Sequence, residues 1–156
     1  MTARLAELLL SLPAVLWAIT FHEFCHGYAA MKLGDPTAKM DGRLSLNPLH
    51  HLDPIGALCL LLFRFGWAKP VPINPGYFKN PRRDMALVSL AGAAGNILTA
   101  FVCAQLVKLF PALFQTYAAQ QFILIMIYMN VGLAAFNLLP IPPLDGSRVL
   151  YVMLPY

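Results

Sequence analysis

The sequence predicts an all-α membrane protein with about three transmembrane helices, a re-entrant element and a small β hairpin. The first observation is composition: 59% of the 156 residues are hydrophobic and only 12% are charged. Soluble domains have about 45–50% apolar and about 25% charged residues. The second observation is that the apolar residues form three long runs, separated by loops rich in proline, glycine and charge. The length allows one domain, residues 1–156.

The first predicted span runs from about Leu5 to Met31. At 1.5 Å per residue this helix is roughly 40 Å long, which is enough to cross a bilayer. Pro13 is expected to kink it, and Gly34-Asp35-Pro36 is a stop signal. Arg4 and the apolar residues after it have some features of a cleaved signal peptide, but the apolar run continues past Pro13. We therefore expect a retained membrane helix.

Three shorter elements are predicted between the first and second spans. Thr37–Pro48 is expected to form a β hairpin, because Asp41-Gly42 is a turn signal and the next four residues alternate between polar and apolar. Pro54–Trp67 is apolar but only about 14 residues long and is interrupted by Arg64, which is typical of a re-entrant or interfacial element. The proline-rich segment Lys69–Pro75 can be neither a helix nor a central strand.

Two further spans are predicted in the second half of the chain. Met85–Val107 is the second, and its Gly92-Ala93-Ala94-Gly95 patch allows close contact with another helix. Ala119–Leu139 is the third, and the prolines that follow it end the helix. A new helix is expected to begin near Asp145, with Asp145 as its N-cap.

Positive charge predicts the orientation of these spans. Eight of the eleven Lys and Arg residues lie between the first and second spans, which places this region in the cytoplasm: Lys32, Lys39, Arg43, Arg64, Lys69, Lys79, Arg82 and Arg83. The third span then returns to the side on which the first one ends. These residues form no basic patch interleaved with aromatics, so no nucleic-acid partner is expected despite the net charge of +4. We expect a multi-pass protein of the cell membrane.

A zinc-binding pattern lies in the last turns of the first span. His22-Glu23-Phe24-Cys25-His26 has the form H-E-x-x-H, and residues four apart on a helix share a face. His22 and His26 can therefore hold one metal ion, while Glu23 can reach a metal-bound water and act as its base. Ionisable residues within an apolar helix are costly and usually mark function.

The third protein ligand of a catalytic zinc is less obvious from spacing. Most other acidic residues lie in turns, in a cap, or about four helical turns away along the same helix, which leaves Asp53 and Asp145. Asp145 is favoured because it follows a span that returns to the correct side of the membrane. Two histidines and one carboxylate suit zinc among the divalent metals.

Three segments of the sequence, taken together, resemble the signature segments of the site-2 protease family of intramembrane metalloproteases. They are His22–His26, Gly66–Pro75 and Asn137–Gly146, and they occur in this order over nearly the whole chain. Family members often carry a proline where this chain has Ala93. They also usually continue with another helix after Leu144-Asp145-Gly146, so we expect a fragment or a shortened form.

The resemblance implies an all-α core that holds one zinc ion per chain, with Asp145 as the third ligand. It implies a site within the bilayer, nearer the cytoplasmic face, that hydrolyses peptide bonds in transmembrane segments of other proteins or peptides. It also implies that Asn137 holds the substrate or stabilises the developing oxyanion, although an interhelical hydrogen bond is an alternative. His51 and Asp53 fit a His-x-Asp-Pro element that gates the site, orients a ligand, or caps a loop.

Two other readings use the same three ligands. One is a non-catalytic membrane protein that binds zinc for structure or transport, but a structural site normally has four protein ligands, and Glu23 would have no role in it. The other is a catalytically capable core that depends on a further helix or partner. Zinc content and peptide cleavage distinguish them.

Overall fold

A computed structural model describes residues 2–63 and 68–153 of the chain. The predicted interruption at Arg64 and the Gly66-Trp67 part of the second signature segment lie outside the described residues. The elements are α1 (Thr2–Lys32), α2 (Thr37–Met40), η1 (Pro48–His50), α3 (Pro54–Phe63), η2 (Pro75–Tyr77), α4 (Pro81–Leu109), η3 (Pro111–Phe114), α5 (Tyr117–Asn137) and α6 (Asp145–Met153). Stretches of α1, α4 and α5 are long and apolar enough to cross a membrane, which confirms the predicted class.

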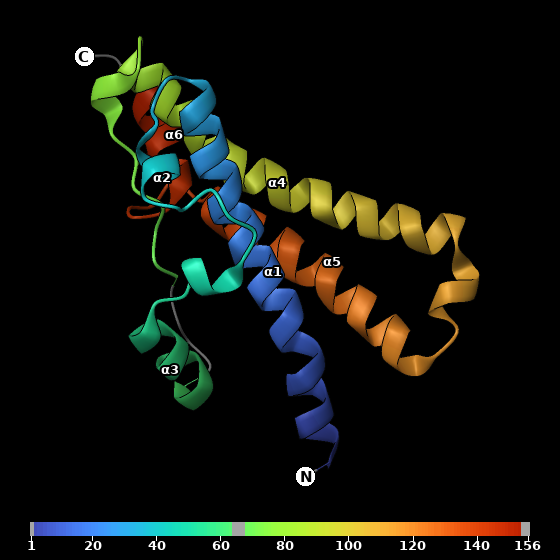
Figure 1. Cartoon of the computed structure of the whole chain (residues 1–156). Helices are drawn as coiled ribbons and strands as arrows, with labels where there is room; N and C mark the ends of the chain where they lie inside the picture. The colour runs from blue at the N-terminus through green and yellow to red at the C-terminus, as the bar shows by residue number, and fades with distance from the viewer. Residues whose placement is uncertain (1, 64–67, 154–156) are drawn as a thin grey trace.

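Helix α4 is the centre of the bundle and packs against α1, α5 and α6 (Figure 1). Helices α1 and α4 are antiparallel, because His26 contacts Val88 and Ala18 contacts Asn96. The face of α4 that these contacts use is made largely of small or polar buried residues, which lets the two helix backbones approach closely. The end of α1, the start of α4 and the start of α6 therefore meet at one end of the bundle.

Helix α1 continues through Pro13 and ends where the stop signal predicts. Gly34 has a φ of 111°, its N–H donates to Met31 O at 3.2 Å, and the Asp35 N–H donates to Ala30 O at 2.9 Å. These two bonds across a left-handed residue are the Schellman arrangement that satisfies the last carbonyls of a helix. The chain turns sharply here and carries Asp35 into a fully buried position.

The β hairpin predicted at Thr37–Pro48 is not found in the structure, which describes all of these residues. Thr37–Met40 form the helical turn α2, because the N–H and the hydroxyl of Thr37 both donate to the Asp35 carboxylate and start a helix. The Asp41-Gly42 turn does form, with Gly42 at a φ of 66°. Within residues 2–63 and 68–153 the only β bridge joins Leu52 and Ala68.

Helix α3 is the least supported helix of the described chain. It makes no extensive contact with another helix and lies apart from α4 and α5 (Figure 1). The Leu52–Ala68 bridge and a hydrogen bond from Lys69 N to His51 O (2.9 Å) join the chain before α3 to the chain after it. Helix α3 is the described part of the Pro54–Trp67 segment, and its re-entrant or interfacial placement stays a prediction.

The connection between α5 and α6 determines where Asp145 lies. The prolines after α5 end it, and α6 begins at Asp145. A Cβ at Gly146 would lie 2.2 Å from Leu138 O and 2.6 Å from Leu139 O. Only glycine allows the start of α6 to fold back this closely on the end of α5, and this fold directs the neighbouring Asp145 towards α1.

Candidate metal centre

Three side chains from the two ends of the described chain converge between α1, α4 and α6. Asp145 Oδ2 lies 3.1 Å from His22 Nε2 and 3.0 Å from His26 Nε2, and the two Nε2 atoms lie 2.9 Å apart. Both histidines are buried, with exposed fractions of 5% and 6%. Among the described residues, these three form the one group of His, Cys, Asp and Glu side chains that could hold a metal ion.

The orientation of the His22 ring is determined by a buried amide chain. Asn96 Nδ2 donates to Ala18 O and to Asn130 Oδ1, both at 2.9 Å, so its Oδ1 must face His22 Nδ1, which lies 2.7 Å away. Asn130 Nδ2 donates in turn to Met126 O at 2.8 Å, and both amides have an exposed fraction of 0%. His22 Nδ1 is therefore the donor, and Nε2 of a neutral ring keeps its lone pair.

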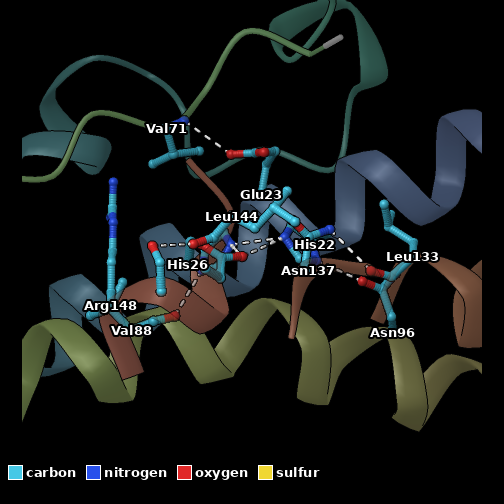
Figure 2. A network of polar contacts seen from close by, with 12 residues as sticks. His22, Glu23, His26, Val71, Val88, Asn96, Leu133, Asn137, Leu144 and Arg148 are labelled. Atoms are coloured by element: carbon cyan, nitrogen blue, oxygen red, sulfur yellow. Dashed lines mark hydrogen bonds and ion pairs between the residues drawn. The ribbon is translucent and has the colours of Figure 1, made fainter. Parts of the chain in front are cut away.

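The His26 ring is oriented by a backbone carbonyl. His26 Nδ1 lies 2.7 Å from Val88 O, which can only accept, so Nδ1 is the donor and Nε2 again keeps its lone pair. This pattern, in which one ring nitrogen donates to the protein and the other is left for a ligand, is the usual support of a metal-binding histidine. Both supporting groups belong to α4 (Figure 2).

The third member of the group is a carboxylate. Burial raises the pKa of Asp145, but hydrogen bonds and charge interactions with the protonated rings of His22 and His26 lower it more strongly, so that the pKa lies well below its ordinary value. Asp145 is therefore ionised at neutral pH. Beside two neutral imidazoles, as a metal site requires, the carboxylate gives the group a net negative charge, which attracts a cation.

These residues fit a divalent metal by their chemistry. His22 Nε2, His26 Nε2 and Asp145 Oδ2 lie about 3 Å from one another, and each directs a lone pair at the others. No single proton among them could bond to all three atoms. A tetrahedral zinc with bonds of 2.0–2.2 Å separates its ligand atoms by about 3.3 Å, so small shifts of the side chains would accommodate the ion. Three protein ligands also leave one coordination position open, as in catalytic sites.

Gly92 of α4 lies directly beneath the two rings. A Cβ at this position would lie 2.5 Å from His26 Nε2 and 2.7 Å from His22 Cε1. Any larger residue would occupy the space in which the imidazoles and their ligand meet. The backbone of α4 is thus the floor of the site.

Glu23 lies beside this group, on the side opposite α4 (Figure 2). Its Oε2 accepts a hydrogen bond from Val71 N at 3.0 Å, on the side of α1 that faces away from α4 (Figure 2). No partner of its Oε1 is found among the described residues. Glu23 is thus the sequence neighbour of His22, yet its carboxylate is held by the segment around Val71 and not by α4.

The other predicted site residues are less tightly linked to the metal group. Asn137 is partly buried, and its Nδ2 donates to Leu133 O of its own helix at 3.0 Å. His51 is 1% exposed and binds Ser45 O through Nε2 (2.7 Å), while its Nδ1 has no partner among the described residues. Asp53 accepts from Gly56 N at the start of α3 (2.8 Å), which is the loop-cap alternative for this residue.

Several groups of the site were not identified from the sequence. Asn96 and Asn130 could have been found, because a buried amide in an apolar helix normally bonds to a functional or structural partner. Asn96 also follows Gly92 by four residues and so shares its face. Val88 O and Val71 N are backbone atoms, so the identity of the residue does not predict that they contact His26 and Glu23.

Comparison with known proteins agrees with this geometry. Residues 107–155 match the profile described as peptidase family M50. The chain is 45% identical over 144 residues to the protein named "Putative zinc metalloprotease YwhC" of Bacillus subtilis, covering 88% of this chain and 66% of the relative. It is 32% identical to "Putative zinc metalloprotease Rip2" of Mycolicibacterium smegmatis, covering 86% and 53%. It is 33% identical to "Putative zinc metalloprotease MJ0611" of Methanocaldococcus jannaschii, covering 91% and 69%.

No solved structure gave a significant match. The chain spans about half to two thirds of the length of these relatives. Each of these matches aligns at least 86% of this chain. The chain therefore belongs to peptidase family M50, the site-2 protease family of intramembrane zinc metalloproteases.

Proposed function

We propose that the chain is the core of a zinc metalloendopeptidase that hydrolyses peptide bonds in transmembrane segments of other proteins. The observation that carries this proposal is the convergence of His22 Nε2, His26 Nε2 and Asp145 Oδ2 within about 3 Å of one another, with Glu23 beside them. We infer that these three side chains bind one zinc ion per chain. Family membership supports zinc over other divalent metals.

The protein groups have distinct tasks in the proposed reaction. Bound zinc supplies a water of lowered pKa and a Lewis acid for the scissile carbonyl. Glu23 accepts the proton of the attacking water on a carboxylate oxygen and delivers it to the leaving amine. Asn137 donates a side-chain N–H to the substrate or to the developing oxyanion, and its Nδ2 has a second N–H for this beside the one bonded to Leu133 O.

We propose that the site lies within the bilayer towards the cytoplasmic face of the cell membrane, in a multi-pass protein. The three candidate spans support this placement, and so does the concentration of Lys and Arg between the first two. The substrate is then a membrane-inserted protein or peptide, and a helical substrate must unwind before its carbonyls reach the site. Regulated intramembrane proteolysis is the corresponding biological role.

The Glu23→Gln variant tests this function. The purified chain, in detergent, is expected to hold one zinc per chain in both forms and to cleave transmembrane peptides only with Glu23. Loss of a general base lowers the rate by about 10²–10⁴-fold. Zinc is counted by mass spectrometry, and cleavage is followed on a panel of unstructured and transmembrane peptides. Asp41→Asn, an exposed carboxylate-to-amide change, serves as the matched control.

Two outcomes would contradict the proposal. Zinc at one per chain without cleavage, also in a version extended to the length of the relatives, would favour the non-catalytic zinc-binding protein. Absence of bound zinc in the wild-type chain would show that the two histidines and Asp145 do not form the site.

A further inference from the structure

The proline-rich segment Lys69–Pro75 is a motif to which the proposed reaction assigns no role. Its prolines are Pro70, Pro72 and Pro75, and proline has no backbone N–H. Only four N–H groups remain in the segment, and one of them, that of Val71, has a proline on each side. The proline that follows Val71 disfavours a helical conformation at this residue.

Three of these four N–H groups are hydrogen-bonded, each to a different part of the chain. Lys69 N donates to His51 O at 2.9 Å, Val71 N donates to Glu23 Oε2 at 3.0 Å, and Asn74 N donates to Asp35 Oδ2 at 2.7 Å. The segment is thus attached to the protein on both sides of Val71. No acceptor for the fourth N–H, that of Ile73, is found among the described residues.

The attachment at Asp35 is rigid. Asp35 has an exposed fraction of 0%, and its other oxygen accepts from the N–H and hydroxyl of Thr37. The Val71 side chain is also buried, at 7% exposed, and its Cγ1 would lie 3.3 Å from a Cβ on Gly27. Gly27 follows Glu23 by one helical turn, so the segment lies directly on α1 at the level of the proposed base.

We propose that the proline-rich segment positions the proposed base, with the Val71 N–H holding Glu23 Oε2 so that Oε1 remains available for the proton of the attacking water. This inference rests on the proposed function of Glu23. A glutamate side chain on a helix has several rotamers, and α1 supplies no group of its own that selects among them. The Val71 backbone is therefore a positioning group, and it does not itself touch the substrate.

Replacing single backbone amides by esters tests the proposal, because an ester removes the N–H and keeps the side chain. Valine at position 71 is replaced by its α-hydroxy acid, and the matched control carries the same change at Ile73. We expect the position-71 ester to lower kcat by about 10- to 100-fold, the usual cost of losing an outer-shell partner, with KM within about twofold. Zinc per chain and Tm are expected to equal those of the position-73 ester.

Equal kcat values for the two esters would overturn the proposal. A fall in zinc content or Tm at position 71 alone would also overturn it, because it would show a general structural role.

Hydrogen exchange of the Val71 amide tests the contact without any need for cleavage. The Glu23→Ala variant is expected to speed exchange at Val71 by about tenfold or more, while the Lys69 and Asn74 amides keep their protection. Unchanged protection at Val71 would show that Glu23 is not its acceptor and would overturn the inference. If no peptide is ever cleaved, the proposed function fails, whereas the exchange result still decides whether the segment holds Glu23.

Discussion

His22 and Glu23 are neighbours in α1, yet the protein supports them in two different ways. His22 bonds to the buried Asn96 side chain and His26 bonds to Val88 O, and both of these groups belong to the long helix α4. Glu23 is held from the opposite side by one N–H of a segment that has no regular structure. The helix side orients the two histidines of the metal group, and the loop side orients the Glu23 carboxylate.

Because the supports are separate, we expect that metal binding and the position of the Glu23 carboxylate can be altered independently. A helix face changes little when a loop moves, because its backbone groups bond within the helix. A single hydrogen bond from a loop can be lost without disturbing the bundle. Substitutions on the α4 side should therefore change zinc affinity, whereas those on the loop side should change turnover or local stability at constant zinc.

The largest effect is expected from Gly92→Ala on the helix side. The new Cβ would lie 2.5 Å from His26 Nε2, so the ring must move away from the metal position. We expect a loss of zinc affinity greater than about 100-fold, beyond the range of outer-shell changes. Gly132→Ala in α5 is the matched control, since its Cβ would meet nothing within 4 Å. Equal zinc titration curves for the two variants would show that α4 is not the floor of the site.

A smaller effect is expected from Asn96→Leu. This change removes the acceptor of His22 Nδ1 and leaves the ring free to turn. Zinc affinity should fall by about 10- to 100-fold, measured by competition with a chelator. Ser89→Ala is the control, because Ser89 is equally buried on α4 and its hydroxyl has no partner among the described residues. An unchanged affinity in Asn96→Leu would mean that the amide serves only to join the helices.

On the loop side, Asp35→Asn should lower stability and leave zinc unchanged. The amide has one acceptor oxygen where the carboxylate uses two, so an N–H of Thr37 or Asn74 faces another donor. The free energy of unfolding should fall by about 1–3 kcal/mol, measured by thermal unfolding of the zinc-loaded protein. The exposed Asp41→Asn is the control. Loss of zinc in Asp35→Asn would show that the loop side also supports metal binding.

The smallest effect is expected in α3, which belongs to neither side. Leu62 is 66% exposed, and Leu62→Ala should change the free energy of unfolding by less than about 0.5 kcal/mol. Val88→Ala, at a position with 0% exposure, should cost about 1–2 kcal/mol because the cavity is not refilled. A larger loss in Leu62→Ala than in Val88→Ala would show that α3 packs on the bundle in solution.

The sequence predicted the three long helices because their apolar runs are far longer than any other apolar run in the chain. It also predicted the meeting of residues 22, 26 and 145, through helical spacing and the direction of the spans. The hairpin predicted at Thr37–Pro48 is not found among the described residues, because four alternating residues are a weak signal and the Asp35 side chain bonds to the first residue of a helical turn instead. That interaction depends on a buried carboxylate, which local patterns do not reveal.

Other features of the site cannot be recognised from the residue types alone. The patch from Gly92 to Gly95 predicted a close helix contact, but a Cβ at Gly92 meets the rings of the metal group, whereas one at Gly95 meets Cys25. The pattern alone does not distinguish these two partners. Val88 O and Val71 N act through the backbone, so only the arrangement of the helices and the proline-rich segment shows their roles.

Asp145 lies 123 positions after His22, with both α4 and α5 between them. A ribosome has therefore made all three candidate spans before it adds the carboxylate. A nascent chain at that stage can place two imidazoles against α4, but two ligands are fewer than the three that catalytic zinc uses. The order of synthesis thus completes the set of three side chains only after all three candidate spans have been made.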